Sequence, residues 1–353
     1  MADHRVAVAG YGLAGRVFHA PLVAAAPGLT LTHVVTTSAE RAAAARSEHP
    51  GVRVVDRVEL LWGEIDLLVV AAPSDVHVPL AEAAIDRGVA VVVDKPLALE
   101  LRSAARLWAR AAEANVLLSV FHNRRWDSDT LTLARLLHEG VLGDVHRFES
   151  RFERWRPDAP AEAWRAAEPA RGGGLLLDLG THLVDQALWL FGPVTSVCAE
   201  VATRRPGHVG EDDAFLALAH ASGVISHLWV SAVAAAPGPR LRVLGSAGAF
   251  TVAGLDGQEA DLRAGRRPGD GAPWGEVAPA DWGRLSRGDE VAPEPVAAQP
   301  GDWPAFYAAM ARALDGVGPV PVDPADAVTV AGVLEAARLS AAEGQRVSVD
   351  PRP

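Results

Sequence analysis

A glycine-rich run near the start of the chain limits its fold more than any other feature. Gly10-Tyr11-Gly12-Leu13-Ala14-Gly15 follows an apolar strand pattern and opens a helical stretch. In this context the first glycine permits a tight turn, the second lets the backbone approach a pyrophosphate, and the third allows the helix to pack closely on the strand. The helix N-terminus then faces the anion. The pattern predicts a dinucleotide site that contains Gly10, Gly12, Leu13, Ala14 and Gly15.

Short apolar runs alternate with helical stretches through the first 120 or so residues. Strands are predicted at 5–9, 31–36, 52–55, 65–72, 89–93 and 116–120, and helices at 15–25, 39–47, 76–87 and 99–114. Such alternation is typical of a parallel sheet covered by helices on both faces. The fold class is therefore α/β, with an N-terminal doubly wound Rossmann domain over residues 1–121.

A different pattern follows, in which a few helices are mixed with a run of strands. Helices are predicted at 128–138 and 175–191, and strands at 145–153, 194–203, 214–219, 224–230 and 241–244. This order indicates an α+β domain, over 122–323, with an open, mainly antiparallel sheet. The Gly- and Pro-rich segment 254–301 reads as a long excursion with a weak hairpin, too irregular to be core. Of two closing helices, 303–314 and 324–343, the second begins a C-terminal part, 324–353, that can pack back on the Rossmann domain.

Composition excludes several classes of partner and site. The formal net charge of −11 argues against nucleic acid. No apolar run reaches the roughly 18 residues of a membrane helix, so no membrane partner is expected. Cys198 is the single cysteine, and the N-terminus lacks the pattern of a signal peptide, which together predict a cytoplasmic protein. No metal site is predicted.

The end of the second predicted strand bears on the choice between NAD and NADP. Its sequence, Val35-Thr36-Thr37-Ser38-Ala39-Glu40-Arg41, has no acidic residue where an NAD-binding chain usually has one. Hydroxyl groups on Thr37 and Ser38 and the Arg41 guanidinium suit a 2′-phosphate, which favours NADP. NAD remains the alternative, because Glu40 is close enough in sequence to reach a ribose and Ser38 also suits a helix N-cap.

Two further strand ends are expected to contact the cofactor, since ligands bind at the carboxyl edge of an open sheet. Ala72 and Pro73 end the fourth predicted strand, and His77 follows them either as a ligand contact or as a helix cap. Asp94-Lys95-Pro96 ends the fifth.

Lys95 is the one lysine among 33 basic residues. An ammonium is a compact charge whose pKa shifts on burial, whereas a guanidinium is planar and always charged, so arginine cannot replace it in such a role. Its place at the binding edge of the sheet, with Pro96 fixing the turn, predicts a catalytic lysine beside the nicotinamide. The alternative is a solvated lysine that has survived by chance.

Asp178 and His182 form a second candidate catalytic group. They are spaced i and i+4 in a predicted helix that follows Gly172-Gly173-Gly174, so they share one face. Gly180 lies inside the same helix, at a cost of about 1 kcal/mol relative to alanine, which suggests the close approach of a ligand or of backbone. Asp185, one turn on, reads as structural.

Together these motifs resemble the Gfo/Idh/MocA family of glucose-fructose oxidoreductase and inositol dehydrogenase relatives. The glycine run, the Asp-x-x-x-His pair and a Glu-Lys-Pro motif carry the likeness, the last with Asp94 in place of Glu. Two stretches resemble most the subgroup that contains NADP-dependent scyllo-inositol dehydrogenase: His122-Asn123-Arg124-Arg125-Trp126-Asp127 and Asp178-Leu179-Gly180-Thr181-His182-Leu183-Val184-Asp185-Gln186. The resemblance implies a homodimer or homotetramer that assembles through the C-terminal sheet, and a cofactor contact by Trp164 and Arg165.

The expected activity is hydride transfer between a nicotinamide and a cyclic polyol or sugar. His182 accepts the hydroxyl proton, Lys95 stabilises the alkoxide and Asp178 orients the imidazole, although the sequence leaves open which of Lys95 and His182 is the formal base. The substrate is expected to contact Asn123, Arg124, Trp126 and Trp155. Two alternatives are a non-catalytic dinucleotide sensor and an enzyme that oxidises and re-reduces a sugar without net cofactor change.

Overall fold

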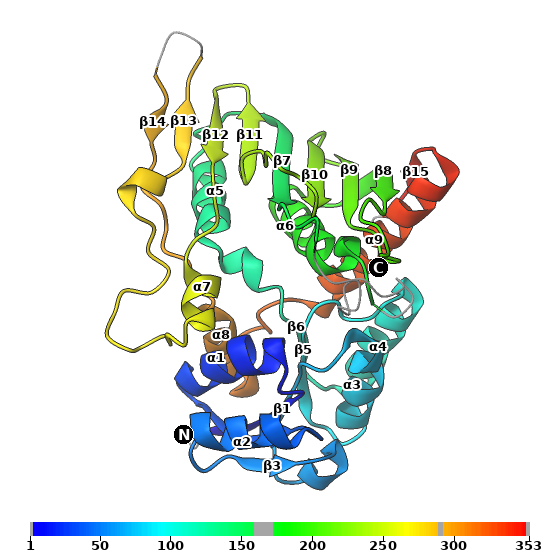
Figure 1. Ribbon diagram of the computed structural model, residues 1–353, viewed down its shortest axis with the longest axis vertical. Helices are drawn as coiled ribbons and strands as arrows, with labels where there is room; N and C mark the ends of the chain where they lie inside the picture. The colour runs from blue at the N-terminus through cyan, green and yellow to red at the C-terminus, as the bar shows by residue number, and fades with distance from the viewer. Residues whose placement is uncertain (1–2, 159–171, 289–291, 351–353) are drawn as a thin grey trace. The chain divides into compact units, whose positions relative to one another are not determined.

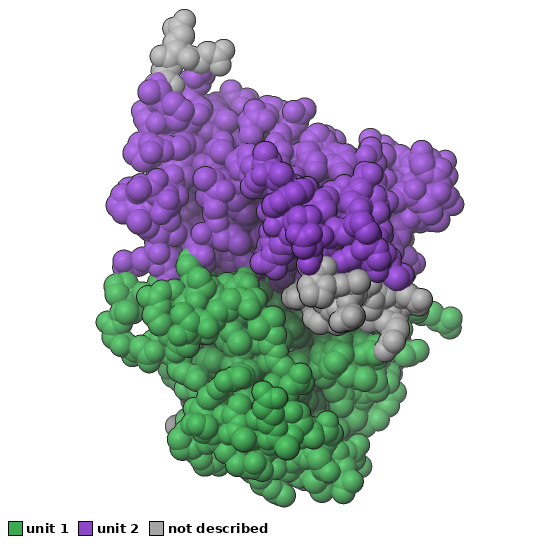
Figure 2. All heavy atoms as spheres, in the orientation of Figure 1, with its two compact units in different colours: residues 1–123, 257–274, 302–328 green, residues 124–256, 275–301, 329–353 purple. Residues whose placement is uncertain are grey.

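The chain forms two compact units, each built from more than one stretch of sequence. The computed structural model describes residues 3–158, 172–288 and 292–350. One unit comprises residues 1–123, 257–274 and 302–328, and the other comprises 124–256, 275–301 and 329–353 (Figure 2). The division differs from the expected boundaries, because 257–274 and 302–328 belong with the N-terminal unit rather than with the second domain.

A six-stranded parallel sheet in the order β3-β2-β1-β4-β5-β6 forms the centre of the first unit (Figure 1). Its strands are β1 (His4–Ala9), β2 (Leu29–Val35), β3 (Arg53–Val55), β4 (Leu67–Val70), β5 (Ala90–Val93) and β6 (Leu118–Val120). All four residues of β4 and of β5 are buried, as expected for strands with helices on both faces. The strand order reverses between β1 and β4, and such a reversal is where open sheets bind ligands. The predicted doubly wound fold is confirmed.

In the first stretch of this unit, residues 1–123, helices follow the strands. Apart from short 3-10 turns, the described ones are a π-helical turn at Ala14–His19 that continues into α1 (Ala20–Ala25), then α2 (Ala39–Glu48), α3 (His77–Ile85) and α4 (Leu101–Ala114). Side-chain capping is seen at α2, where the Ser38 hydroxyl accepts a hydrogen bond from the backbone N–H of Arg41 over 3.3 Å.

Part of the predicted excursion is core, which corrects the expectation for 254–301. Within it, α7 (Gln258–Arg263) buries Gln258 and Leu262. The Gln258 side-chain oxygen accepts hydrogen bonds from the indole N–H of Trp274 over 2.9 Å and from the backbone N–H of Trp303 over 2.7 Å. Trp303 precedes α8 (Pro304–Leu314). Two hydrogen bonds to one buried amide fix this segment against the first unit's core, and its glycine and proline content gives no sign of such contacts.

The second unit is built on a nine-stranded sheet in the order β14-β13-β12-β11-β7-β10-β9-β8-β15 (Figure 1). The strands are β7 (Val145–Glu153), β8 (Val194–Ala202), β9 (Asp213–His220), β10 (Ile225–Ser231), β11 (Leu241–Gly245), β12 (Gly248–Val252), β13 (Arg284–Ser286), β14 (Glu294–Pro295) and β15 (Val347–Ser348). Only the β7–β10 pair is parallel among the described pairings of this sheet. Buried and half-buried residues alternate along β9, the pattern of a strand with one covered face.

The α-helices described wholly or mainly in this unit are α5 (Ser128–His138), α6 (Thr181–Phe191) and α9 (Pro324–Glu343). The last begins in the first unit and enters the second at Thr329. There the Ser340 hydroxyl accepts a hydrogen bond from the backbone N–H of Ala199 over 3.0 Å, and β15 pairs with β8. Most of the C-terminal part therefore packs on the second unit. Among the described residues no helix is long and apolar enough to cross a membrane.

Candidate active site

The carboxyl ends of β1, β4 and β5 bring three predicted groups together in the first unit. At Gly10, φ is +98°, and a Cβ added there would lie 2.5 Å from the carbonyl oxygen of Ala71 at the end of β4. A Cβ on Gly15 would lie 1.9 Å from the Gly10 carbonyl oxygen. Both positions therefore exclude any side chain, and the helix that begins at Ala14 packs directly on the turn, as the glycine pattern predicts.

Gly12 differs from these two glycines, because its missing side chain leaves open space. The guanidinium of Arg41 is the one group near a Cβ built there, at 3.8 Å. An open cradle at the N-terminus of a helix, with a cation beside it, suits a dinucleotide. The residues present thus fit an NAD(P) cofactor. The same contact places Arg41, which is predicted to bind the 2′-phosphate, next to the glycine turn. Thr37 and Ser38 directly precede α2, the helix that contains Arg41.

His77 links the loop after β4 to the turn that carries Lys95. Its Nδ1 lies 2.8 Å from the carbonyl oxygen of Pro96, and its Nε2 lies 2.9 Å from that of Ala72. The side chain is buried, and it is not a cap for its own helix, since no side-chain capping bond is present at α3. Its role in this structure is to hold two strand ends together, while direct contact with the cofactor stays a prediction, as it does for Ala72, Pro73 and Pro96.

Asp94 supports the turn that Lys95 occupies. One carboxylate oxygen accepts a hydrogen bond from the backbone N–H of Lys95 over 2.9 Å and lies 3.6 Å from Nε2 of His19. Burial disfavours the charged carboxylate, but His19 and Lys95 outweigh burial and lower the pKa of Asp94 below its usual value. The carboxylate is therefore ionised at neutral pH beside the one ammonium side chain of the protein.

In the second unit, the helix with Asp178 and His182 is not a plain α-helix. Leu176–Gly180 forms a π-helical turn that leads into α6, so the i, i+4 register expected for Asp178 and His182 is not that of a regular α-helix. Such turns are frequent at functional sites. Both side chains are nearly buried, with 8% and 7% exposed. Gly180 is approached by leucine: a Cβ there would lie 3.1 Å from the side chain of Leu176.

Phe152 on β7 links His182 to two arginines. The His182 ring lies edge-on to it with centroids 6.3 Å apart, while the guanidinium carbons of Arg124 and Arg240 lie 4.9 and 4.4 Å from the ring centre. Arg124 was expected from the sequence to bind substrate, but Arg240 and Phe152 were not. No motif marks these two residues, since Phe152 lies within β7 and Arg240 directly precedes β11 of an ordinary sheet.

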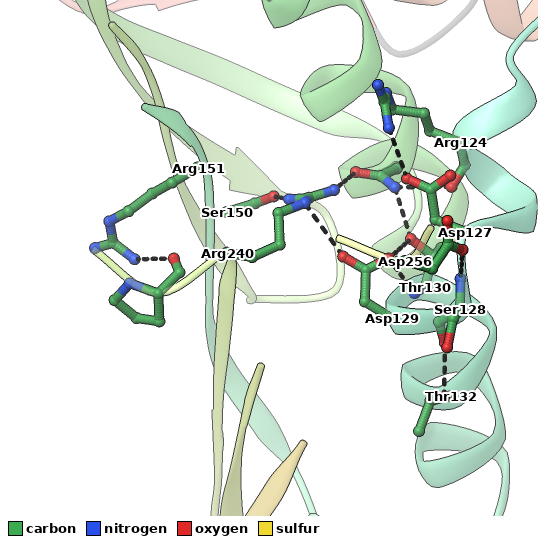
Figure 3. A network of polar contacts seen from close by, with 12 residues as sticks. Arg124, Asp127, Ser128, Asp129, Thr130, Thr132, Ser150, Arg151, Arg240 and Asp256 are labelled. Atoms are coloured by element: carbon green, nitrogen blue, oxygen red, sulfur yellow. Dashed lines mark hydrogen bonds and ion pairs between the residues drawn. The ribbon is translucent and has the colours of Figure 1, made fainter. Parts of the chain in front are cut away.

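These arginines belong to a buried polar network (Figure 3). Arg124 pairs with Asp127 over 3.1 Å, and Arg240 pairs with Asp129 over 3.2 Å and donates to the side chain of Gln186 over 2.8 Å. Burial raises the pKa of Asp127 to about 7, and the nearby Asp129 and Asp256 add to the increase against the opposing effect of Arg124. Burial also lowers the pKa of Arg240, opposed by Asp129 and Asp127.

The remaining predicted residues vary in exposure. Asn123 is buried, Trp126 is half-buried, and Trp155 is 58% exposed. Asp185, read as structural, forms a buried ion pair with Arg125 at 2.6 Å. Trp164 and Arg165 lie outside the described residues. Lys95 belongs to the first unit, whereas Asp178 and His182 belong to the second. No cluster of three or more His, Cys, Asp or Glu side chains suited to a metal is found in the described part of the chain.

Comparison with known proteins gives matches over both units. Residues 4–122 match the model of an oxidoreductase family with an NAD-binding Rossmann fold, and residues 130–251 match the GFO/IDH/MocA C-terminal domain. The sequence is 41% identical to the uncharacterized oxidoreductase YdgJ of Escherichia coli, covering 95% of this chain and 96% of that one. It is 33% identical to the NADP(+) scyllo-inositol 2-dehydrogenase IolW of Bacillus subtilis, covering 98% and 96%.

Solved structures are similar over the full length. The Bacillus subtilis protein yvaA has a TM-score of 0.93 at 33% identity, covering 99% of each chain. The Yersinia pestis protein YPO2259 has a TM-score of 0.92 at 38% identity, covering 100% of this chain and 99% of that one.

The raised pKa of Asp127 predicts a specific dependence of stability on pH. The folded chain holds this proton up to about pH 7, whereas the unfolded chain releases it near pH 4. Between these values the folded state binds more protons, so the free energy of unfolding should fall as pH rises, by up to ~1.4 kcal/mol per pH unit. Asp127→Asn should flatten that slope in urea unfolding measured from pH 4 to 7. The exposed Asp281→Asn is the control, and an unchanged slope in Asp127→Asn would contradict the assignment.

Proposed function

The chain belongs to the Gfo/Idh/MocA family of NAD(P)-binding oxidoreductases, and we propose that it uses NADP to interconvert a hydroxyl and a ketone on a cyclic polyol or sugar. The observation that carries the proposal is the position of Lys95 at the carboxyl end of β5, held by Asp94 and adjoining the glycine turn across β4. The inositol-like substrate class is supported by the name of the Bacillus subtilis relative.

The chain's own residues divide the proton chemistry between them. A bound nicotinamide supplies the acceptor or donor of the hydride. In the oxidative direction His182 accepts the proton of the substrate hydroxyl, and Asp178 orients the imidazole. Lys95 donates a hydrogen bond to the same oxygen and stabilises its developing negative charge. The low exposure of His182, against the apolar Phe152, supports this assignment because a ligand bound there would be shielded from solvent.

Substrate binding is assigned to residues around Phe152 and to exposed aromatic surface. Arg124 lies over the same ring that His182 touches, so both can reach one ligand. Asn123 and Trp126 adjoin Arg124 in sequence, and the exposed indole of Trp155 offers an apolar face to a sugar ring. Trp164 and Arg165 are proposed to contact the cofactor.

Assembly through the nine-stranded sheet is also part of the proposal. Along β9 and β10, Phe215, His227 and Trp229 are only half-buried, and their rings lie 5.1 to 6.0 Å from one another on the face opposite the buried residues. A half-buried aromatic face of this kind is what a homodimer or homotetramer would cover.

One screen separates the proposed activity from its two alternatives. NADPH absorbance is followed while a panel of cyclic polyols and keto-sugars is added with either cofactor. A dehydrogenase gives a continuous absorbance change with product. A sensor binds NADPH without turnover, and a transiently redox enzyme gives product without an absorbance change. Either of the last two outcomes would contradict the proposal.

Removal of Lys95 should separate binding from chemistry. Lys95→Met retains most of the length of the side chain but donates no hydrogen bond, so turnover should fall by about 10³-fold or more. The dissociation constant for NADPH, measured by fluorescence titration, should stay within a few fold. Arg102→Met, which removes an exposed cation from α4, should change neither quantity. Near-normal turnover in Lys95→Met would remove Lys95 from the chemistry.

Cofactor choice should depend on Arg41. If its guanidinium pairs with the 2′-phosphate, Arg41→Ala should raise KM for NADP by about tenfold or more and leave KM for NAD within a few fold. Arg46→Ala, which removes another exposed cation from α2, is the matched control. A lower KM for NAD than for NADP in the unaltered enzyme, at equal turnover, would overturn the proposed preference.

A further inference from the structure

A buried histidine, His19, lies between Asp94 and a buried tyrosine, Tyr307. Nδ1 of His19 is 2.6 Å from the hydroxyl of Tyr307, and Nε2 is 3.6 Å from the Asp94 carboxylate. Neither His19 nor Tyr307 is exposed to solvent. His19 ends the helical turn that the glycine run opens, and Tyr307 belongs to α8, which is more than 200 residues away in sequence.

The surroundings of this pair are aromatic. The ring of Phe121, which directly follows β6, lies 4.4 Å from that of His19 and 5.9 Å from that of Tyr307. Phe306 lies 4.9 Å from Phe121. The two phenylalanine rings offer the Tyr307 phenol no hydrogen-bond partner. Their packing also restrains the orientation of the His19 imidazole.

The chemistry of the three groups fixes the direction of the hydrogen bond. Burial, with the negative charge of Asp94, raises the pKa of Tyr307 well above its usual value, so the phenol keeps its proton. A carboxylate at Asp94 attracts an N–H rather than a nitrogen lone pair. His19 therefore carries its hydrogen on Nε2, toward Asp94, and accepts the hydroxyl of Tyr307 at Nδ1.

We propose that Tyr307 and His19 are positioning residues for Lys95. Tyr307 selects the His19 tautomer that faces Asp94, and Asp94 in turn holds the backbone N–H of Lys95 and lies in the field of its ammonium. The separation of 3.6 Å is longer than a hydrogen bond, so the link between His19 and Asp94 is electrostatic. The value of this arrangement to catalysis rests on the proposed function of Lys95.

The test exploits the presence of a single lysine. Reductive methylation of the full chain with ¹³C-formaldehyde gives one lysine resonance, with the terminal amine as an internal reference. Tyr307→Phe should move or broaden the Lys95 resonance. Ser119→Ala removes another buried hydroxyl from the same unit, one that bonds to Val322, and should leave the resonance unchanged. An unmoved resonance in Tyr307→Phe would overturn the proposal.

A second pair of variants keeps the test decisive if Tyr307→Phe folds poorly. His19→Gln retains an N–H donor for Asp94, whereas His19→Leu retains none, and both lose the imidazole. The Lys95 resonance should stay closer to that of the unaltered protein in His19→Gln. Identical spectra in the two variants would show that His19 only fills space and would overturn the proposal.

Kinetics then separate this proposal from the proposed function. Tyr307→Phe should lower kcat by about tenfold or more, with the NADPH dissociation constant unchanged, because misplacing a catalytic group costs turnover rather than cofactor binding. If Lys95→Met retains turnover while Tyr307→Phe still moves the lysine resonance, the proposed function fails and the positioning link stands.

Discussion

The backbone contact between the turn at Gly10 and the end of β4 is the constraint on which the first unit depends. Neither Gly10 nor Gly15 tolerates a Cβ, because carbonyl oxygens occupy the space. Because these glycines have no side chains, the helical turn at Ala14 begins directly against the sheet. The loops after β1, β4 and β5 then lie at the same edge of the sheet. His77 ties the second loop to the third through two carbonyl oxygens. The position of Lys95 is therefore a property of the sheet rather than of its own turn alone.

Charge is handled differently in the two units. In the first, one carboxylate, that of Asp94, lies in the field of one ammonium, that of Lys95, and the buried ring of His19 lies 3.6 Å from that carboxylate. In the second, arginines and aspartates compensate one another inside the network around Phe152, at the cost of keeping Asp127 protonated near neutral pH. A compensated network of this kind holds side chains in fixed places.

Local sequence patterns predicted the structural features that are determined by residues close together in the sequence. The glycine run predicted the turn, and valine-rich runs predicted β4 and β5, because fully buried strands require continuous apolar sequence. The π-helical turn before His182 was not predicted, since its spacing of apolar residues is close to that of an α-helix. The contact between Arg240 and Gln186 joins residues 54 positions apart, and the pairing of His19 with Tyr307 joins residues 288 positions apart. Local patterns give no information on contacts at such separations. The burial of Gln258 was not predicted for the same reason. Tyr307 is one of only two tyrosines in the chain, and this scarcity, like that of lysine, was a signal that could have singled it out.

Selective chemical modification tests the central claim most directly, because the chain has a single lysine amine. Acetylation removes the charge of Lys95 and its capacity to act as a strong donor, and peptide mass spectrometry gives the fraction modified. The account predicts that turnover falls in proportion to that fraction and reaches zero when Lys95 is fully acetylated, with NADP(H) protecting it. Full acetylation with turnover retained would contradict the account.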